Sequence, residues 1–175
     1  SIDIEPGRCL ITVLMRKGLT LCLVNVHIPP QWPIKHKIAL MKKLRSALPD
    51  AEHGLTVMLG DCNINFEGDA VLVDAQGRMS KHKASATFMN GFVDTFPFAV
   101  ELMQDMPTHK SGDVYTRLDR CFVIIITSFL VDSRPQCATC WSFNHRFGGS
   151  SDHLPLHVSL GVTNGERAQS IPKWI

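Results

Sequence analysis

The sequence predicts an α/β fold built on a mixed or antiparallel β-sheet. Two apolar runs, residues 8–15 and 19–28, are joined by a short turn containing glycine, which is typical of a β-hairpin. A stretch with helical periodicity follows at 33–48. Later strand-like runs lie in the first half of 54–69, at 115–131 and at 154–162. Hairpin-linked strands beside a helix favour a mixed sheet over a purely parallel one.

The two strands of the expected hairpin are apolar on both faces. Strands of this kind are usually internal to a sheet and covered on both sides. Pro29 and Pro30 end the second strand, because proline cannot donate a backbone hydrogen bond. We therefore expect the hairpin to lie inside the sheet.

The helix expected at 33–48 is amphipathic. Pro33 suits a first helical position, and Pro49 stops the helix. Apolar residues recur at spacings of three and four and predict one buried stripe. This stripe comprises Ile34, Ile38, Met41, Leu44 and Leu48. The cations Lys35, Lys37, Lys42, Lys43 and Arg45 are expected to form a solvated face.

Three segments have a weaker pattern. Residues 87–103 are expected to hold one or two short helices, 104–113 to be a loop, and 134–149 to be irregular at its end. Residues 164–175 are polar and then end in "IPKWI", which is typical of a linker or tail.

Composition bounds the class of protein. The chain has 175 residues, of which 45% are hydrophobic, and this suits one domain with a substantial core. The net charge of +2 does not by itself favour nucleic acid as a partner. No apolar run approaches the roughly 20 residues of a membrane span, so no membrane partner is expected.

Four of the six cysteines lie in or beside apolar strand-like runs. Free cysteine in such a place acts as a small hydrophobe, so we expect reduced thiols and an intracellular compartment. These four are Cys9, Cys22, Cys62 and Cys121.

Polar, proton-handling residues stand where apolar strands end or are interrupted. Each has a structural alternative: Asp61 and Asn63 could cap a turn, and Asp119 could form an ion pair with Arg117 or Arg120. Their joint occurrence favours a site. The set comprises His27, Asp61, Asn63, Asp119, Asp152 and His153.

Four motifs around these residues occur in a recognisable order. They are "NVHIPP" at 25–30, "GDCNI" at 60–64, "RLDRCFV" at 117–123 and "SSDHLPL" at 150–156. This set resembles the endonuclease/exonuclease/phosphatase superfamily, the deoxyribonuclease I-like proteins, and most of all the endonuclease domains of non-LTR retrotransposons. The resemblance covers about residues 8–162.

The resemblance implies a four-layered α/β sandwich of two mixed or antiparallel β-sheets flanked by helices, with the first strands missing. Residues 1–163 would form the C-terminal two-thirds of such a domain. The parent polypeptide would continue after 164–175, and a reverse transcriptase domain is the expected neighbour. A retrotransposon origin would imply a nuclear location.

The resemblance also implies an activity, the metal-dependent hydrolysis of phosphodiesters. The cofactor would be Mg²⁺, with Mn²⁺ as a substitute, and the favoured reaction is the nicking of DNA. Asp61 would orient or deprotonate the attacking water and help hold metal, while Asn63 would hydrogen-bond the phosphate.

The same resemblance assigns the remaining roles. His153 would contact a phosphoryl oxygen or move a proton, and Asp119 would fix its tautomer. Asp152 matches a metal-side carboxylate. His27 stands where relatives place a His or a Tyr near the scissile phosphate, and a His there could act as general acid.

The chain departs from the family pattern in two ways. Cys62 replaces a residue that is usually Phe, which should change packing and not chemistry. The family's first Asn motif and its metal-binding Glu lie before the strand matching 8–15. We therefore expect weak or absent activity in this chain alone.

Three alternatives stay open at this point. The substrate could instead be a small molecule, a lipid headgroup or RNA, since the choice depends on loops. The "CATC" at 137–140 with His145 could bind zinc, although a closed site needs four ligands. The chain could also be a decayed, non-catalytic copy. Candidate groove-binding residues are Lys81, His82, Lys83, His109, Lys110, Trp141 and Arg146.

Overall fold

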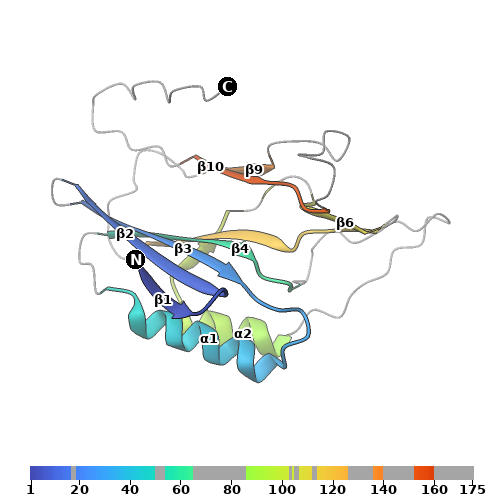
Figure 1. Cartoon of the computed structure of the whole chain (residues 1–175), viewed down its shortest axis with the longest axis horizontal. Helices are drawn as coiled ribbons and strands as arrows, with labels where there is room; N and C mark the ends of the chain where they lie inside the picture. The colour runs from blue at the N-terminus through green and yellow to red at the C-terminus, as the bar shows by residue number, and fades with distance from the viewer. Residues whose placement is uncertain are drawn as a thin grey trace.

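A six-stranded mixed sheet is the centre of the computed structural model (Figure 1). The structure describes residues 1–16, 19–49, 54–64, 86–102, 104, 107–111, 114–125, 136–139 and 152–159. The sheet order is β1-β2-β3-β4-β8-β5, and only β3 and β4 pair in parallel. Its strands are β1 (Ile2–Glu5), β2 (Cys9–Arg16), β3 (Leu19–His27), β4 (Gly54–Asp61), β8 (Asp119–Ile125) and β5 (Ala99–Glu101).

Two helices and two small strand pairs complete the described structure. Helices α1 (Ile34–Ala47) and α2 (Ala86–Thr95) cover one face of the sheet, and β9 and β10 lie on the other (Figure 1). The pairs are β9 (Gln136–Thr139) with β10 (Leu156–Ser159), and β6 (His109–Ser111) with β7 (Val114–Thr116), both antiparallel. The predicted α/β fold with a mixed sheet flanked by helices is therefore confirmed.

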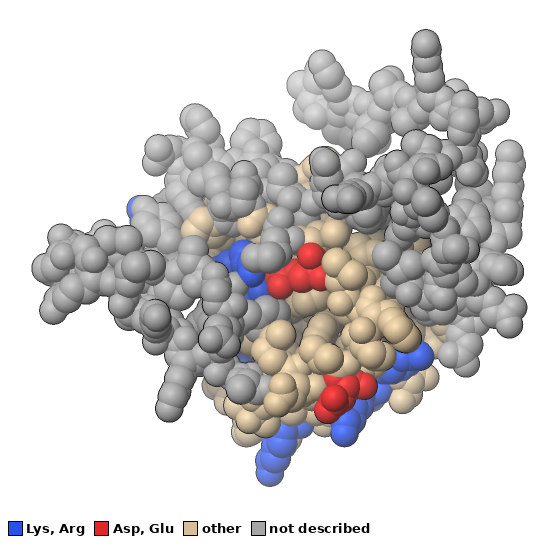
Figure 2. Space-filling model, turned by 180° about the vertical axis from the view of Figure 1, so that it is seen from behind, with Lys and Arg blue, Asp and Glu red and all other residues tan. Residues whose placement is uncertain are grey.

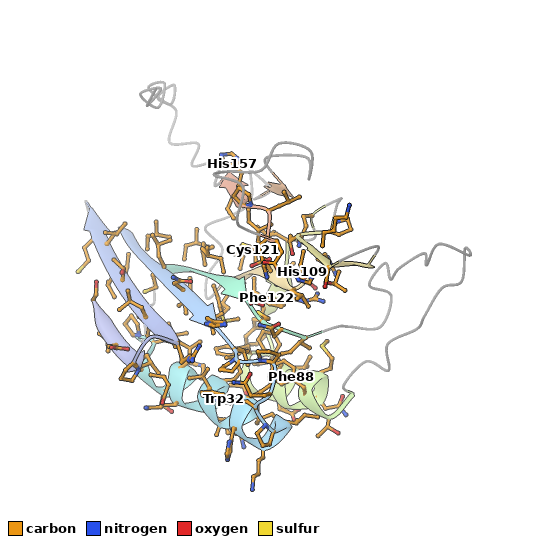
Figure 3. All side chains as sticks on the ribbon, turned by 45° about the vertical axis from the view of Figure 1, so that its right-hand side comes forward. Trp32, Phe88, His109, Cys121, Phe122 and His157 are labelled. Carbon is orange, nitrogen blue, oxygen red and sulfur yellow. The ribbon has the colours of Figure 1, made fainter. Side chains whose placement is uncertain are left out.

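The core lies on both faces of the sheet because side chains alternate along each strand. On the helix side, Met58 and Phe122 pack with Phe88 and Phe92 of α2. Figure 3 shows Phe88 on the helix layer and His109 and His157 on the other side of Phe122. The second cluster lies toward β10 and comprises Val57, Cys121 and Val123 with Leu21, Leu23, Leu55, Leu59, Leu102 and Val158.

The predicted hairpin is present, but its first strand is not covered on both faces. Cys9 and Ile11 are buried beneath the sheet, whereas Leu10 and Leu14 are 42% and 49% exposed. Leu10 and Leu14 are exposed because β2 lies next to the edge strand β1, whereas the apolar cluster on that face of the sheet is built on β3, β4 and β8 and does not reach β2. That part of the prediction is wrong.

Helix α1 begins one residue later than expected, and it buries the predicted stripe without Ile34 and with Lys37 and Leu40 added. Pro33 is the N-cap, and Ile34, the first helical residue, is 39% exposed. Met41 and Leu44 are buried as predicted, but Lys37 is buried too, at 7% exposure. The other cations of α1 remain at the surface, and Figure 2 shows basic side chains along the rim on the helix side. The solvated-face prediction fails only for Lys37.

Three weakly patterned segments contain strands that the sequence did not reveal. The second half of 87–103 forms β5, the loop expected at 104–113 contains β6, and the segment 134–149, expected to be irregular at its end, contains β9 near its start. Asp119 begins β8 and does not interrupt a strand. Strands β5, β6 and β9 are only three or four residues long, which is too short for an alternating hydrophobic pattern to predict a strand.

The four cysteines Cys9, Cys22, Cys62 and Cys121 are buried and free, as expected. Neither α1 nor α2, the helices that the structure describes, is long and apolar enough to cross a membrane.

Candidate active site

Three polar residues stand side by side across one end of the six-stranded sheet. His27, the last residue of β3, pairs with Asp61, the last residue of β4. Asp61 in turn pairs with Asp119, the first residue of β8. By alternation, all three belong to the face of the second core cluster, the side on which β10 lies. The sheet register therefore brings together groups that are 92 positions apart in the sequence, from 27 to 119.

The turn after β4 fixes the carboxylate of Asp61. Its Oδ1 accepts the backbone N–H of Asn63 at 3.0 Å, and its Oδ2 accepts the Asn63 amide at 2.7 Å. Asn63 has a φ of 46°, a left-handed conformation that asparagine tolerates better than most residues. Gly60 has a φ of 141° and lies against the backbone of Val26, so the turn needs glycine there.

Two buried cations hold this turn from the helix side. Lys37 Nζ donates to the carbonyl of Asn63 at 3.3 Å, and Arg120 donates to the carbonyl of Ile64 at 3.0 and 3.3 Å. Burial lowers the pKa of Lys37, against the opposing effect of the Asp61 charge. Arg120 also pairs with Glu101 at 2.7 Å, and Arg117 lies 3.4 Å from the same carboxylate oxygen, so both arginines considered as partners of Asp119 contact Glu101.

Asp119 and His153 form a short hydrogen-bonded pair. The Oδ2 of Asp119 lies 2.7 Å from Nδ1 of His153, and the two side chains are 16% and 30% exposed. This hydrogen bond raises the pKa of His153 against the effect of desolvation, and the charges of Asp61 and Asp152 act in the same direction. The pair therefore fixes one ring orientation and favours the charged imidazole.

The guanidinium of Arg8 contacts the imidazole ring of His27. Nη1 of Arg8 lies 2.8 Å from Nδ1 of His27, and Nε2 of His27 lies 3.9 Å from Oδ2 of Asp61. A guanidinium can only donate, so Nδ1 accepts and the ring proton sits on Nε2. His27 thus presents an N–H toward the space beside Asp61.

Asp152 lies at the outer side of the same cluster. Its carboxylate is 66% exposed and lies 3.3 Å from Nε2 of His109. Its own backbone N–H, followed by the charges of His153 and His109, lowers the pKa of Asp152. The backbone holds this region in place, because His109 and His153 form a β-bridge.

The structure thus gathers all six predicted residues at one end of the sheet, although their catalytic roles stay predictions. Sequence reasoning missed Arg8 and Lys37 and treated His109 only as a groove-binding candidate. The hairpin register could have revealed Arg8, since His27 donates its backbone N–H to the Arg8 carbonyl at 2.7 Å. The other groove candidates except Lys110, and the zinc-ligand side chains at 137–145, lie outside the residues whose side chains are described.

Three solved structures resemble this chain. The first is the "Endonuclease domain of TRAS1, a telomere-specific non-LTR retrotransposon", with TM-score 0.59 and 18% identity over 91% of this chain and 64% of that one. The second is CdtB, "the biologically active subunit of Cytolethal Distending Toxin", with TM-score 0.54 and 16% identity over 89% and 53%. The third is beta toxin from Staphylococcus aureus, with TM-score 0.54 and 12% identity over 87% and 56%.

At these low sequence identities, the similarity to the three structures establishes the fold of the chain. The chain has the fold of the deoxyribonuclease I-like proteins, as its motifs predicted. It spans less than two-thirds of each of the three structures. No protein-family model matches the chain, and no curated protein matches it.

Proposed function

We propose that this chain, with its deoxyribonuclease I-like fold, carries the site of a metal-dependent phosphodiester hydrolase that nicks DNA. The observation that carries the proposal is the Asp119–His153 pair beside Asp61. The pair bond is 2.7 Å long, and Asp61 neighbours Asp119 on the next strand. A charged imidazole fixed next to an oriented carboxylate is suited to an anionic ester and its attacking water.

The attacking side of the reaction is assigned to the turn after β4. Asp61 orients a water and accepts its proton, because Asn63 holds its two oxygens in one orientation. His153, charged through its contact with Asp119, binds a phosphoryl oxygen and offsets its negative charge. Lys37 and Arg120 hold the turn backbone and keep this geometry without touching substrate.

The leaving side of the reaction is assigned to His27. Its Nε2–H points toward the space beside Asp61, at 3.9 Å from that carboxylate, and can donate a hydrogen bond to the departing oxygen, whose proton then comes from water. Arg8 keeps Nδ1 as an acceptor and adds a positive charge next to the ester. With a hydrogen-bond donor on β3 and a base on β4, the leaving and attacking sides of the ester face neighbouring strand ends.

Asp61 and Asp152 supply the oxygen donors that a hard divalent cation such as Mg²⁺ or Mn²⁺ prefers. Both are carboxylates; Asp152 is 66% exposed, which leaves room for the several waters that Mg²⁺ keeps. Hydrogen bonds from Asn63 leave lone pairs on the Asp61 oxygens. The ion would neutralise the phosphoryl oxygens and make the phosphorus more reactive.

DNA is the favoured substrate because a retrotransposon endonuclease domain has the same fold. The test is nicking of supercoiled plasmid in Mg²⁺, with EDTA as the metal-free comparison. Asp61→Asn should lower the rate by about 10²–10⁴-fold, the usual contribution of a general base. His157→Ala, which changes an exposed histidine on β10, is the control and should nick like the unchanged chain.

Other outcomes separate the alternatives. We expect the chain alone to be slower than full-length relatives, because it spans 64% of the TRAS1 domain. If the chain hydrolyses RNA or a phosphate monoester but does not nick DNA, the substrate belongs to that class and the DNA assignment is wrong. A chain that neither binds nor cleaves any of these esters would be a non-catalytic copy, and the proposed function would be wrong.

A further inference from the structure

His109, Asp152 and His153 form a cluster whose chemistry differs from that of the carboxylate pair above. One ligand atom from each lies within 4.8 Å of the other two. The two imidazole rings lie close together, with centroids 4.8 Å apart and planes tilted by 55°. Two nitrogens and one carboxylate oxygen are the donors that Zn²⁺ and Co²⁺ prefer, whereas Mg²⁺ prefers oxygen alone.

The cluster is fixed by the backbone and does not depend on long side chains meeting. Lys110 donates its backbone N–H to the carbonyl of Asp152 at 2.9 Å, and Leu154 donates to the carbonyl of Thr108 at 2.6 Å. These two hydrogen bonds flank the β-bridge between His109 and His153. The two histidines are therefore directly opposite each other, and their side chains start from neighbouring Cα atoms. Thr108 is fully buried, which anchors this pairing in the interior.

Each imidazole is also oriented at its Nδ1 by an oxygen. Nδ1 of His109 lies 2.8 Å from the Thr116 hydroxyl, and Nδ1 of His153 lies 2.7 Å from Asp119. Metal-binding histidines almost always have such an oxygen partner on the second nitrogen. Ligation from both rings therefore goes through Nε2, and Nε2 of His109 already lies 3.3 Å from Oδ2 of Asp152.

The cluster is open to ions from solvent. Asp152 is 66% exposed, and the His109 and His153 side chains are 16% and 30% exposed. The carboxylates of Asp61, Asp119 and Asp152 all act electrostatically on His153, so this end of the sheet attracts cations.

We propose that His109, Asp152 and His153 bind a transition-metal dication such as Zn²⁺, with water completing the coordination. The site goes beyond the proposed hydrolase function, because it recruits His109 and withdraws His153 from substrate. Zn²⁺ would then oppose Mg²⁺-supported catalysis at the same end of the sheet.

The test is titration of the purified chain with ZnCl₂ and with CoCl₂, by calorimetry and by visible absorption of bound Co²⁺. We expect one equivalent to bind. His109→Ala and Asp152→Asn should each weaken binding by at least about 10-fold, and Thr116→Val by about 10–100-fold, the usual effect of losing an outer partner. His157→Ala is the matched histidine control and should bind like the unchanged chain. Far-UV circular dichroism checks that each variant is folded.

Three results would overturn the proposal: no stoichiometric binding, equal binding by all four variants, or a thiolate-to-Co²⁺ charge-transfer band. The last would place the ion on cysteine, as the "CATC" alternative predicts. The readout is binding and not hydrolysis, so failure of the proposed function would leave this test intact.

Discussion

Gly60 occupies the position where the sheet is least tolerant of a side chain. It pairs with Val26 across β3 and β4 and immediately precedes Asp61. A Cβ built on Gly60 would lie 1.9 Å from the backbone carbonyl oxygen of Val26 and 2.9 Å from its carbonyl carbon. Neither atom can move as a side chain could, so Gly60→Ala must push the two strands apart or distort the turn.

The cost has two sources. Overpacking against the core costs about 1–3 kcal/mol, and holding alanine at a φ of 141° costs about 1–3 kcal/mol more. We therefore expect Gly60→Ala to lower the free energy of unfolding by about 4 kcal/mol. At ~2–4 °C per kcal/mol for a domain of this length, Tm should fall by roughly 8–16 °C.

Gly7 provides the matched control. It also has a positive φ, 65°, but a Cβ there would meet nothing within 4 Å. Gly7→Ala should therefore cost only the left-handed strain, about 1–2 kcal/mol. Urea denaturation of both variants measures the difference. If both variants lose the same free energy of unfolding, the expectation is wrong, because the steric clash with the Val26 backbone would then not destabilise the protein.

Three further predictions follow from buried or paired groups. Arg120→Met should cost about 3 kcal/mol in urea denaturation, since it removes the 2.7 Å ion pair with Glu101 and both hydrogen bonds to the Ile64 carbonyl and leaves Glu101 only Arg117 at 3.4 Å. Exposed Arg45→Met should stay within about 0.5 kcal/mol, and similar losses for the two variants would contradict this. Burial raises the pKa of the Cys62 thiol from 9.0 to about 12, so the neutral thiol's contribution to stability is complete below pH 9. That contribution is lost as the pH rises toward 12, by about 1.4 kcal/mol per pH unit. Cys62→Ala should therefore make the free energy of unfolding fall less steeply with pH in this range, and an unchanged slope would contradict the burial effect. Asp119→Asn should lower the pKa of His153, followed by NMR of the imidazole, and an unshifted titration would exclude the hydrogen bond as the main cause.

Local patterns predicted the parts of this fold that depend on local rules. The hairpin of β2 and β3 and helix α1 follow from apolar periodicity, a turn glycine and prolines at the ends. The strands β5, β6 and β9 have three or four residues each, and the partners of β5 and β9 lie across long connections in the sequence. For example, Val100 of β5 pairs with Val123 of β8, a contact that no local pattern encodes.

The same contrast holds for the site. Polar residues at strand ends identified Asp61, Asp119 and His27, because a polar group at the end of an apolar strand is conspicuous. Lys37 was not identifiable, since its burial depends on where the carbonyl of Asn63 comes to lie after β4 and α1 pack together. His109 was likewise visible only as a loop residue until its bridge to His153 was known.

In the proposed site, one phosphodiester is bound by side chains from distant parts of the chain. The most direct measurement is an NMR titration with a thymidine dinucleotide, following the imidazole signals of His27 and His153. Both signals should shift with one apparent Kd, while those of exposed His157 stay in place. A ligand that moves only one of the two, or moves them with unrelated Kd values, would contradict a shared site.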